Sequence, residues 1–189
     1  MTSINAYTQR WWLRSWMPTF LAFPVSGLVT RIAVGPIDTT PSALAGGLLV
    51  GSALGGLQYN ALRRFGLPLS WIPVSAAGTA LGGVLSSLVV GFGTELTSLM
   101  SRGVVTGAVL GMAQALLQQR PPRHALLWSG VNAVMWGLAW WITSLVIRDD
   151  VETNYAVFGS SGAIVLTAVL LWCLPSVLPA YPPMRKERP

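Results

Sequence analysis

Long apolar stretches separated by short polar turns dominate the pattern of hydrophobic and polar positions along this chain. A helix that crosses a lipid bilayer needs about 20 mostly apolar residues, and six stretches approach or reach that length. They cover residues 18–36, 42–62, 70–92, 98–118, 125–147 and 155–177. The turns between them contain charged residues together with proline and glycine, which interrupt helices. The pattern predicts an all-α, polytopic membrane bundle of six transmembrane helices over residues 18–177.

The composition excludes a water-soluble version of this bundle. Of the 189 residues, 52% are hydrophobic and only 10% are charged, whereas a soluble domain carries about a quarter charged residues. The mean hydropathy is +0.57. The net charge of +6 could suggest nucleic acid as a partner, but the basic residues occur mainly as pairs between apolar stretches, not as a continuous face. We therefore expect a lipid bilayer, and no nucleic acid, as the environment of this chain.

The charged residues indicate an orientation. Counted from the N-terminus, the odd-numbered segments outside the membrane hold nine basic residues: Arg10, Arg14, Arg63, Arg64, Arg120, Arg123, Arg185, Lys186 and Arg188. The even-numbered segments hold one basic residue and five acids: Arg148, Asp38, Glu95, Asp149, Asp150 and Glu152. Because cytoplasmic loops are enriched in Lys and Arg, both termini are predicted to be cytoplasmic and the protein to reside in the plasma (inner) membrane.

The two ends of the chain are expected to lie outside the six-helix domain. Residues 1–17 interleave arginines with tryptophans: Arg10, Trp11, Trp12, Arg14 and Trp16. This mixture is typical of an amphipathic helix that lies in the membrane interface. Residues 178–189 are predicted to form a basic cytoplasmic tail.

Tryptophans within the predicted helices fall into two groups. Because tryptophan is enriched at membrane interfaces, a belt at one level is expected from Trp71, Trp128 and Trp172. A second group lies near the middle and outer part of the fifth stretch and is expected to form one aromatic ridge: Trp136, Trp140 and Trp141. Such a ridge can face lipid, a neighbouring protein or a flat hydrophobic ligand, and the sequence leaves these three open.

Two pairs of predicted helices share one motif at an offset of 56 residues. The matched positions are Gly51 with Gly107, Gly55 with Gly111, Gln58 with Gln114, and Arg64 with Arg120. Each motif leads into a basic turn and a helix that opens with tryptophan. Helical hairpins at about 42–92 and 98–147 are therefore predicted to be parallel copies of one unit. A weaker third copy would combine the sixth and first helices, from Gly159–Gly162 and Pro24–Gly27.

The glycines of this motif have the spacing of helix contacts in lipid. Small residues at every fourth position let helix backbones touch, and the rows here contain Gly51, Gly55, Gly103, Gly107 and Gly111. Gln58 and Gln114 are expected to hydrogen-bond across the contact; lining a substrate path is the alternative. Over residues 43–141 the pattern resembles a loose group of uncharacterised bacterial multi-pass membrane proteins. The resemblance implies a hairpin architecture and no particular activity.

Few residues suggest chemistry. Arg31 and Arg102 lie inside predicted helices toward their outer ends, where an arginine either reaches the headgroups and pairs with an acid, or binds a ligand. Asn132 is a further candidate ligand contact. His124 is the only histidine and Cys173 the only cysteine, so a metal site is not expected. No catalytic residues and no cofactor are predicted.

The sequence favours a non-enzymatic role. Our leading hypothesis is a structural or accessory subunit that binds other membrane subunits. The alternative is a small-solute carrier, or the substrate-binding subunit of a transporter, with polar residues lining its site: Arg31, Asn132, Arg102, Gln58 and Gln114. A third is a pigment- or lipid-binding protein that uses the aromatic ridge.

Overall fold

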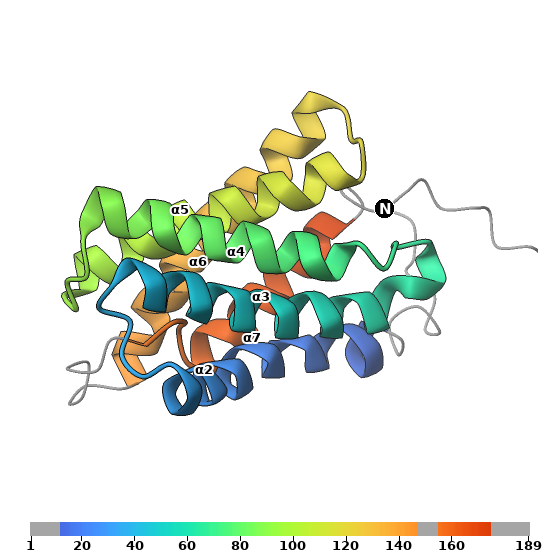
Figure 1. The fold of residues 1–189 in the computed structure, drawn as a ribbon. Helices are drawn as coiled ribbons and strands as arrows, with labels where there is room; N and C mark the ends of the chain where they lie inside the picture. The colour runs from blue at the N-terminus through green and yellow to red at the C-terminus, as the bar shows by residue number, and fades with distance from the viewer. Residues whose placement is uncertain (1–11, 147–154, 175–189) are drawn as a thin grey trace, which may run out of the picture.

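The computed structural model describes residues 12–146 and 155–174, and within these ranges the secondary structure is helical, with no strand. Its α-helices are α2 (Ala22–Ala33), α3 (Thr40–Leu62), α4 (Trp71–Val90), α5 (Leu96–Leu117), α6 (Pro122–Val146) and α7 (Ser160–Cys173), as Figure 1 shows. Four of them, α3 to α6, are long and apolar enough to cross a membrane. The other two are shorter, with 12 residues in α2 and 14 in α7.

The long helices occupy the second to fifth predicted stretches, and local sequence explains several of their ends. At the start of α3, Thr39 Oγ1 accepts a hydrogen bond from the Ser42 backbone, and Ser42 Oγ accepts one from the Thr39 backbone. This reciprocal pair is a capping box. Gly66 follows the 3₁₀ turn at the end of α3, with a φ value of +85°, and Gly91 follows α4, with a φ value of +79°. Glycine suits these positions because it alone enters that region without strain.

The first predicted stretch has an irregular beginning. A π-helical turn, η1 (Trp12–Trp16), and a 3₁₀ turn, η2 (Met17–Leu21), lead directly into α2, with helical backbone angles at both junctions. Pro18 and Pro24 lack the N–H group that an α-helix needs, which explains the change of helix type. Of the predicted interfacial segment, residues 1–11 lie outside the described ranges. So do the tail at 178–189 and the outer loop from Arg148 to Glu152.

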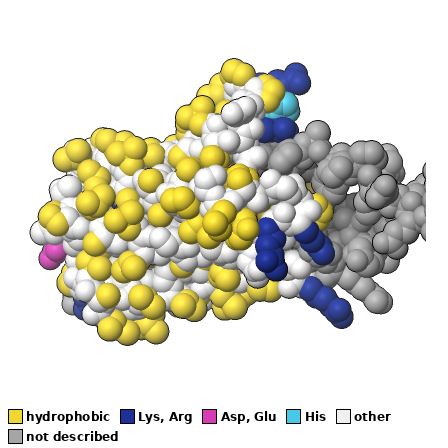
Figure 2. Space-filling model, turned by 45° about the vertical axis from the view of Figure 1, so that its right-hand side comes forward, with side chains coloured by type: hydrophobic (Ala, Val, Ile, Leu, Met, Phe, Trp, Pro, Cys, Tyr) yellow, Lys and Arg dark blue, Asp and Glu magenta, His cyan; other side chains and the backbone are white. Residues whose placement is uncertain are grey.

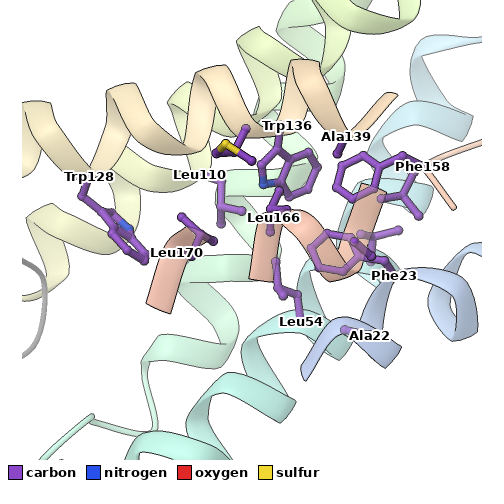
Figure 3. Close-up of a cluster of buried hydrophobic side chains, with 14 of the residues drawn as sticks. Ala22, Phe23, Leu54, Leu110, Trp128, Trp136, Ala139, Phe158, Leu166 and Leu170 are labelled. Atoms are coloured by element: carbon purple, nitrogen blue, oxygen red, sulfur yellow. The ribbon is translucent and has the colours of Figure 1, made fainter. Parts of the chain in front are cut away.

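The helices pack in chain order and close on themselves. Each helix from α2 to α7 contacts the next, and α7 returns to η2 and α2. Figure 3 shows the centre of this arrangement, where side chains from distant parts of the chain meet. Phe23, Leu54, Leu110, Trp136 and Leu166 come from five different helices, and each has at most 2% of its surface exposed. The α5–α6 hairpin ends in a turn that projects from the bundle in Figure 1.

The outside of the bundle is apolar along its length and charged at its ends. Ile32, Leu88 and Leu126 are 77%, 70% and 64% exposed, and hydrophobic side chains spread over the face seen in Figure 2. Basic side chains gather at one end of that face (Figure 2). This surface is compatible with a multi-pass membrane protein, because helices satisfy their backbone hydrogen bonds internally and can present apolar side chains to lipid.

Candidate functional site

A buried hydrogen-bond network joins the two hairpins near the end of the bundle that carries the basic turns. Gln114 Nε2 donates to Gln58 Oε1 at 3.2 Å and to Ser75 Oγ at 2.9 Å. Trp71 Nε1 donates to Gln58 Oε1, and Trp128 Nε1 donates to Gln114 Oε1, both at 3.0 Å. No side chain of this glutamine network is more than 3% exposed. Gln58 and Gln114, one of the pairs that the 56-residue offset matched, are thus in direct contact.

The network corrects the predicted tryptophan belt. Trp71 and Trp128 are 1% and 0% exposed, so they lie inside the bundle, and of the three only Trp172 faces outward, at 80% exposed. Tryptophan enrichment near membrane interfaces predicts the depth of the side chain but not the direction it faces. In this bundle both indole N–H groups donate to buried glutamines, as a buried tryptophan usually finds a hydrogen-bond acceptor.

Trp16 makes a third contact of the same kind. Its side chain is 1% exposed and its Nε1 donates to the Thr167 carbonyl of α7 at 2.8 Å. Trp16 therefore belongs to the bundle rather than to an interfacial segment. In a third copy of the repeat, the position 56 residues after Gln114 is Leu170. Leu170 is buried, and its side chain cannot accept a hydrogen bond from an indole. The indole of Trp16 binds a backbone carbonyl instead.

The matched glycines lie where helix backbones approach most closely. A Cβ at Gly51 would lie 2.7 Å from Ala76 Cα of α4, and one at Gly55 would lie 3.0 Å from Ile72 Cα. On α5 the neighbours belong to α6. A Cβ would lie 2.7 Å from Trp136 O at Gly103, 2.5 Å from Asn132 O at Gly107 and 2.8 Å from Ser129 Cα at Gly111. Equivalent glycines thus contact the following helix in both hairpins.

Arg102 borders a small cavity at the opposite end of the bundle from the glutamine network. The cavity has a volume of about 30 Å³ and is enclosed by α3 to α6 and by residues of two connecting segments. Its polar lining residues are Thr79, Ser86, Arg102 and Thr106. Arg102 is 9% exposed, and its Cζ lies 6.0 Å from the centre of the Phe92 ring, within reach of a cation–π interaction. A cavity of this volume can hold about two water molecules.

Arg31 and Asn132 do not join this cavity. Arg31 lies in the last turn of α2 and borders a separate groove between α2, α6 and residues 155–159. Asn132 is 1% exposed, and its Nδ2 donates to the Trp128 carbonyl one turn earlier in α6, at 2.9 Å. The three candidate ligand residues therefore occupy three different environments.

The predicted aromatic ridge is divided between the inside and the outside. Trp136 and Trp140 are 2% and 8% exposed, whereas Trp141 is 43% exposed. Residues four apart share a face of an α-helix, but each single step turns by about 100°, which points Trp141 away from the others. The buried pair packs around Phe158. The ring centre of Phe158 lies 5.3 Å from that of Trp136 and 6.0 Å from that of Trp140, and both contacts are edge-on.

Phe23 and Phe158 complete this aromatic cluster and were not singled out from the sequence. Their rings stack with centres 4.8 Å apart, and Phe23 meets Trp136 edge-on at 5.7 Å (Figure 3). Such pairs contribute about 0.5–1.5 kcal/mol each. The two phenylalanines are far apart in the chain, and Phe158 precedes a helix rather than lying in one. No local pattern could have paired them.

The described residues offer no cluster of three or more His, Cys, Asp and Glu side chains that could hold a metal ion. Comparison with known proteins adds no identity, since no family model, curated protein or solved structure matches this chain.

Proposed function

We propose that this protein is a non-catalytic integral membrane protein that serves as a structural or accessory subunit of a larger membrane complex. It would cross the plasma (inner) membrane six times, with α2 and α7 as parts of the first and last spans and both termini in the cytoplasm. The end of the bundle with the exposed arginines Arg63, Arg64 and Arg123 would face the cytoplasm, as the positive-inside rule favours.

The observation that carries this proposal is that three of the candidate polar side chains, Gln58, Gln114 and Asn132, have hydrogen-bond partners within the bundle. Gln58 and Gln114 use their side chains within the glutamine network, and Asn132 binds its own helix. In lipid such hydrogen bonds and close glycine contacts hold helices together. A bundle in which these three side chains already have hydrogen-bond partners is suited to a fixed shape that other subunits can bind.

Purification in a mild detergent tests the proposal. The tagged protein is expected to bring down the same membrane proteins in constant ratio from its native membrane, and each of them, when tagged in turn, should recover this chain. A single 20.2 kDa species that resists all partners in two different detergents would contradict the proposal.

One observation favours the alternative of a solute carrier. The Arg102 cavity has a cation and three hydroxyl-bearing residues on its wall, a combination that suits a small anion or polar solute. Under this alternative a solute raises the melting temperature of the purified protein, and Arg102→Gln abolishes that increase while the protein still inserts and folds. Under our proposal no such solute-dependent stabilisation is found.

The predicted orientation can be tested with single cysteines in a Cys173→Ala background. Arg64 and Glu95 are both exposed, at the turns after α3 and before α5. We expect Glu95→Cys to react with a membrane-impermeant maleimide in intact cells. Arg64→Cys should react only after the membrane is opened. The reverse pattern would show the inverted orientation.

A further inference from the structure

A groove beside Arg31 lies directly against the aromatic cluster. It has a volume of about 310 Å³ and lies between α2, α6 and residues 155–159. This volume is at the lower end of the range of small-molecule sites, about 300–1,000 Å³. Phe23 and Phe158 are buried at its base, whereas Leu28 and Tyr155, 62% and 40% exposed, lie at its rim.

The interior of the groove is suited to hydrocarbon. Aromatic and aliphatic side chains form most of the wall, including the stacked pair of Phe23 and Phe158. The one hydroxyl from α6, Thr143 Oγ1, accepts a hydrogen bond from the Gly159 backbone at 3.1 Å, so it already has a partner. An occupant without polar groups along most of its length therefore fits here best.

Among the described residues that line the groove, Arg31 is the only charged one. It lies in the last turn of α2 and is half-buried, and the structure records no hydrogen bond, ion pair or ring contact of its side chain among the described residues. A guanidinium stays protonated at any physiological pH and binds phosphate through two parallel hydrogen bonds. A cation beside an apolar groove recognises a molecule with an anionic head and an apolar tail.

We propose that the groove binds one anionic phospholipid, with an acyl chain over Phe23 and Phe158 and the phosphate at Arg31. The end of α2 that carries Arg31 would then lie at the level of the lipid headgroups, as expected for an arginine near the end of a membrane helix. The site goes beyond the proposed accessory role and rests only on the placement of α2 in a bilayer.

Native mass spectrometry of the protein from vesicles of equal parts phosphatidylglycerol and phosphatidylcholine tests the proposal. We expect one phosphatidylglycerol to be retained in preference to phosphatidylcholine. Arg31→Gln should reduce this preference about tenfold, the effect of losing a hydrogen bond to a charged group. Arg123→Gln removes the same charge from an exposed position in the first turn of α6 and should leave the preference unchanged. Equal retention of both lipids, or a wild-type preference in Arg31→Gln, would overturn the proposal.

A second variant locates the acyl chain. A Cβ at Gly27 would meet only Val157 Cγ1, at 3.3 Å, and Gly27 borders the groove. Gly27→Leu should therefore fill the groove and displace the lipid; Gly56→Leu, where a Cβ meets nothing within 4 Å, should not. Full lipid retention in a folded Gly27→Leu protein would overturn the location. Displacement of the lipid by inorganic phosphate, or a retained pigment in its place, would overturn the identity of the occupant.

Discussion

Alanine at Gly51 or Gly107 is expected to destabilise the protein strongly, whereas alanine at Gly56 or Gly130 is expected to be neutral or slightly stabilising. The first two positions have the backbone of the next helix against them, with Ala76 Cα at 2.7 Å and Asn132 O at 2.5 Å from the added Cβ. At the other two positions a Cβ meets nothing within 4 Å.

The physical reason is that a helix backbone cannot yield as a flexible side chain can. A methyl group at Gly51 forces α4 away from α3, and one at Gly107 forces α6 away from α5. Overpacking of this kind costs about 1–3 kcal/mol and sometimes more. At the open positions, alanine gains up to about 1 kcal/mol because glycine is the poorer helix former. The expected difference between the two pairs is therefore about 1–4 kcal/mol.

The measurement is unfolding of the purified protein by increasing sodium dodecyl sulfate in a mild detergent, followed by circular dichroism. Gly51 and Gly56 both lie on α3, whereas Gly107 lies on α5 and Gly130 on the other helix of the same hairpin, α6. Each hairpin therefore contains its own control. If Gly51→Ala and Gly56→Ala unfold at the same detergent composition, α3 and α4 do not approach as closely as described.

The positions of the four long helices could be predicted because bilayer thickness fixes how many apolar residues a span needs. The first stretch was less regular than its hydropathy indicated. Pro18 and Pro24 both fall within it, and hydropathy does not register the N–H groups that proline lacks. Only Ala22–Ala33 forms an α-helix there, and the described part of the last stretch contains the 14 residues of α7.

The direction in which side chains face was less predictable than their depth. Trp71 and Trp128 were expected at an interface because tryptophan is common there, but the acceptor of each indole lies on a neighbouring helix, which no single stretch reveals. Trp141 could have been separated from Trp136 by the helical repeat alone, since a step of five residues turns about 140° away. Gly82 of α4 and Gly137 of α6 both contact α5, the first at Thr106 and the second at Val104.

The repeat was the most informative signal because it relates residues that are distant in the chain. Two glutamines in copies of one hairpin, in the same orientation, lie at the same depth, so a contact between them requires only that the hairpins be neighbours. The aromatic cluster has no such signal. Phe23 and Phe158 belong to different parts of the chain without a shared motif, and their stacking follows from how α2 and α7 close the bundle.

The second large effect is expected at the glutamine network, where Gln114→Leu should destabilise the protein by about 2–4 kcal/mol. The substitution removes the hydrogen bonds to Gln58 and Ser75 and leaves Trp128 Nε1 without an acceptor. Interhelical hydrogen bonds in membrane proteins contribute about 0.6 kcal/mol on average, and a buried donor left unsatisfied costs about 1–3 kcal/mol. Gln58→Leu should cost less, since it removes the bonds from Trp71 and Gln114 while Gln114 keeps Ser75.

A matched control lies one turn further along the chain. Gln118 Nε2 is buried and has no partner among the described residues, so Gln118→Leu relieves an unsatisfied group and should be neutral or stabilising. If Gln118→Leu and Gln114→Leu destabilise equally, the effect comes from the change of side chain and not from the network.

A double-mutant cycle separates the unsatisfied indole from the other losses. In the wild-type protein Trp128→Phe leaves Gln114 Oε1 without this donor, and it also removes packing volume. In the Gln114→Leu protein the same change removes a donor that already lacks its acceptor, so it should destabilise by about 1 kcal/mol less. Trp172→Phe, at a position 80% exposed, should show no such dependence on residue 114. Equal effects of Trp128→Phe in both backgrounds would mean that the bond between Trp128 and Gln114 does not stabilise the bundle.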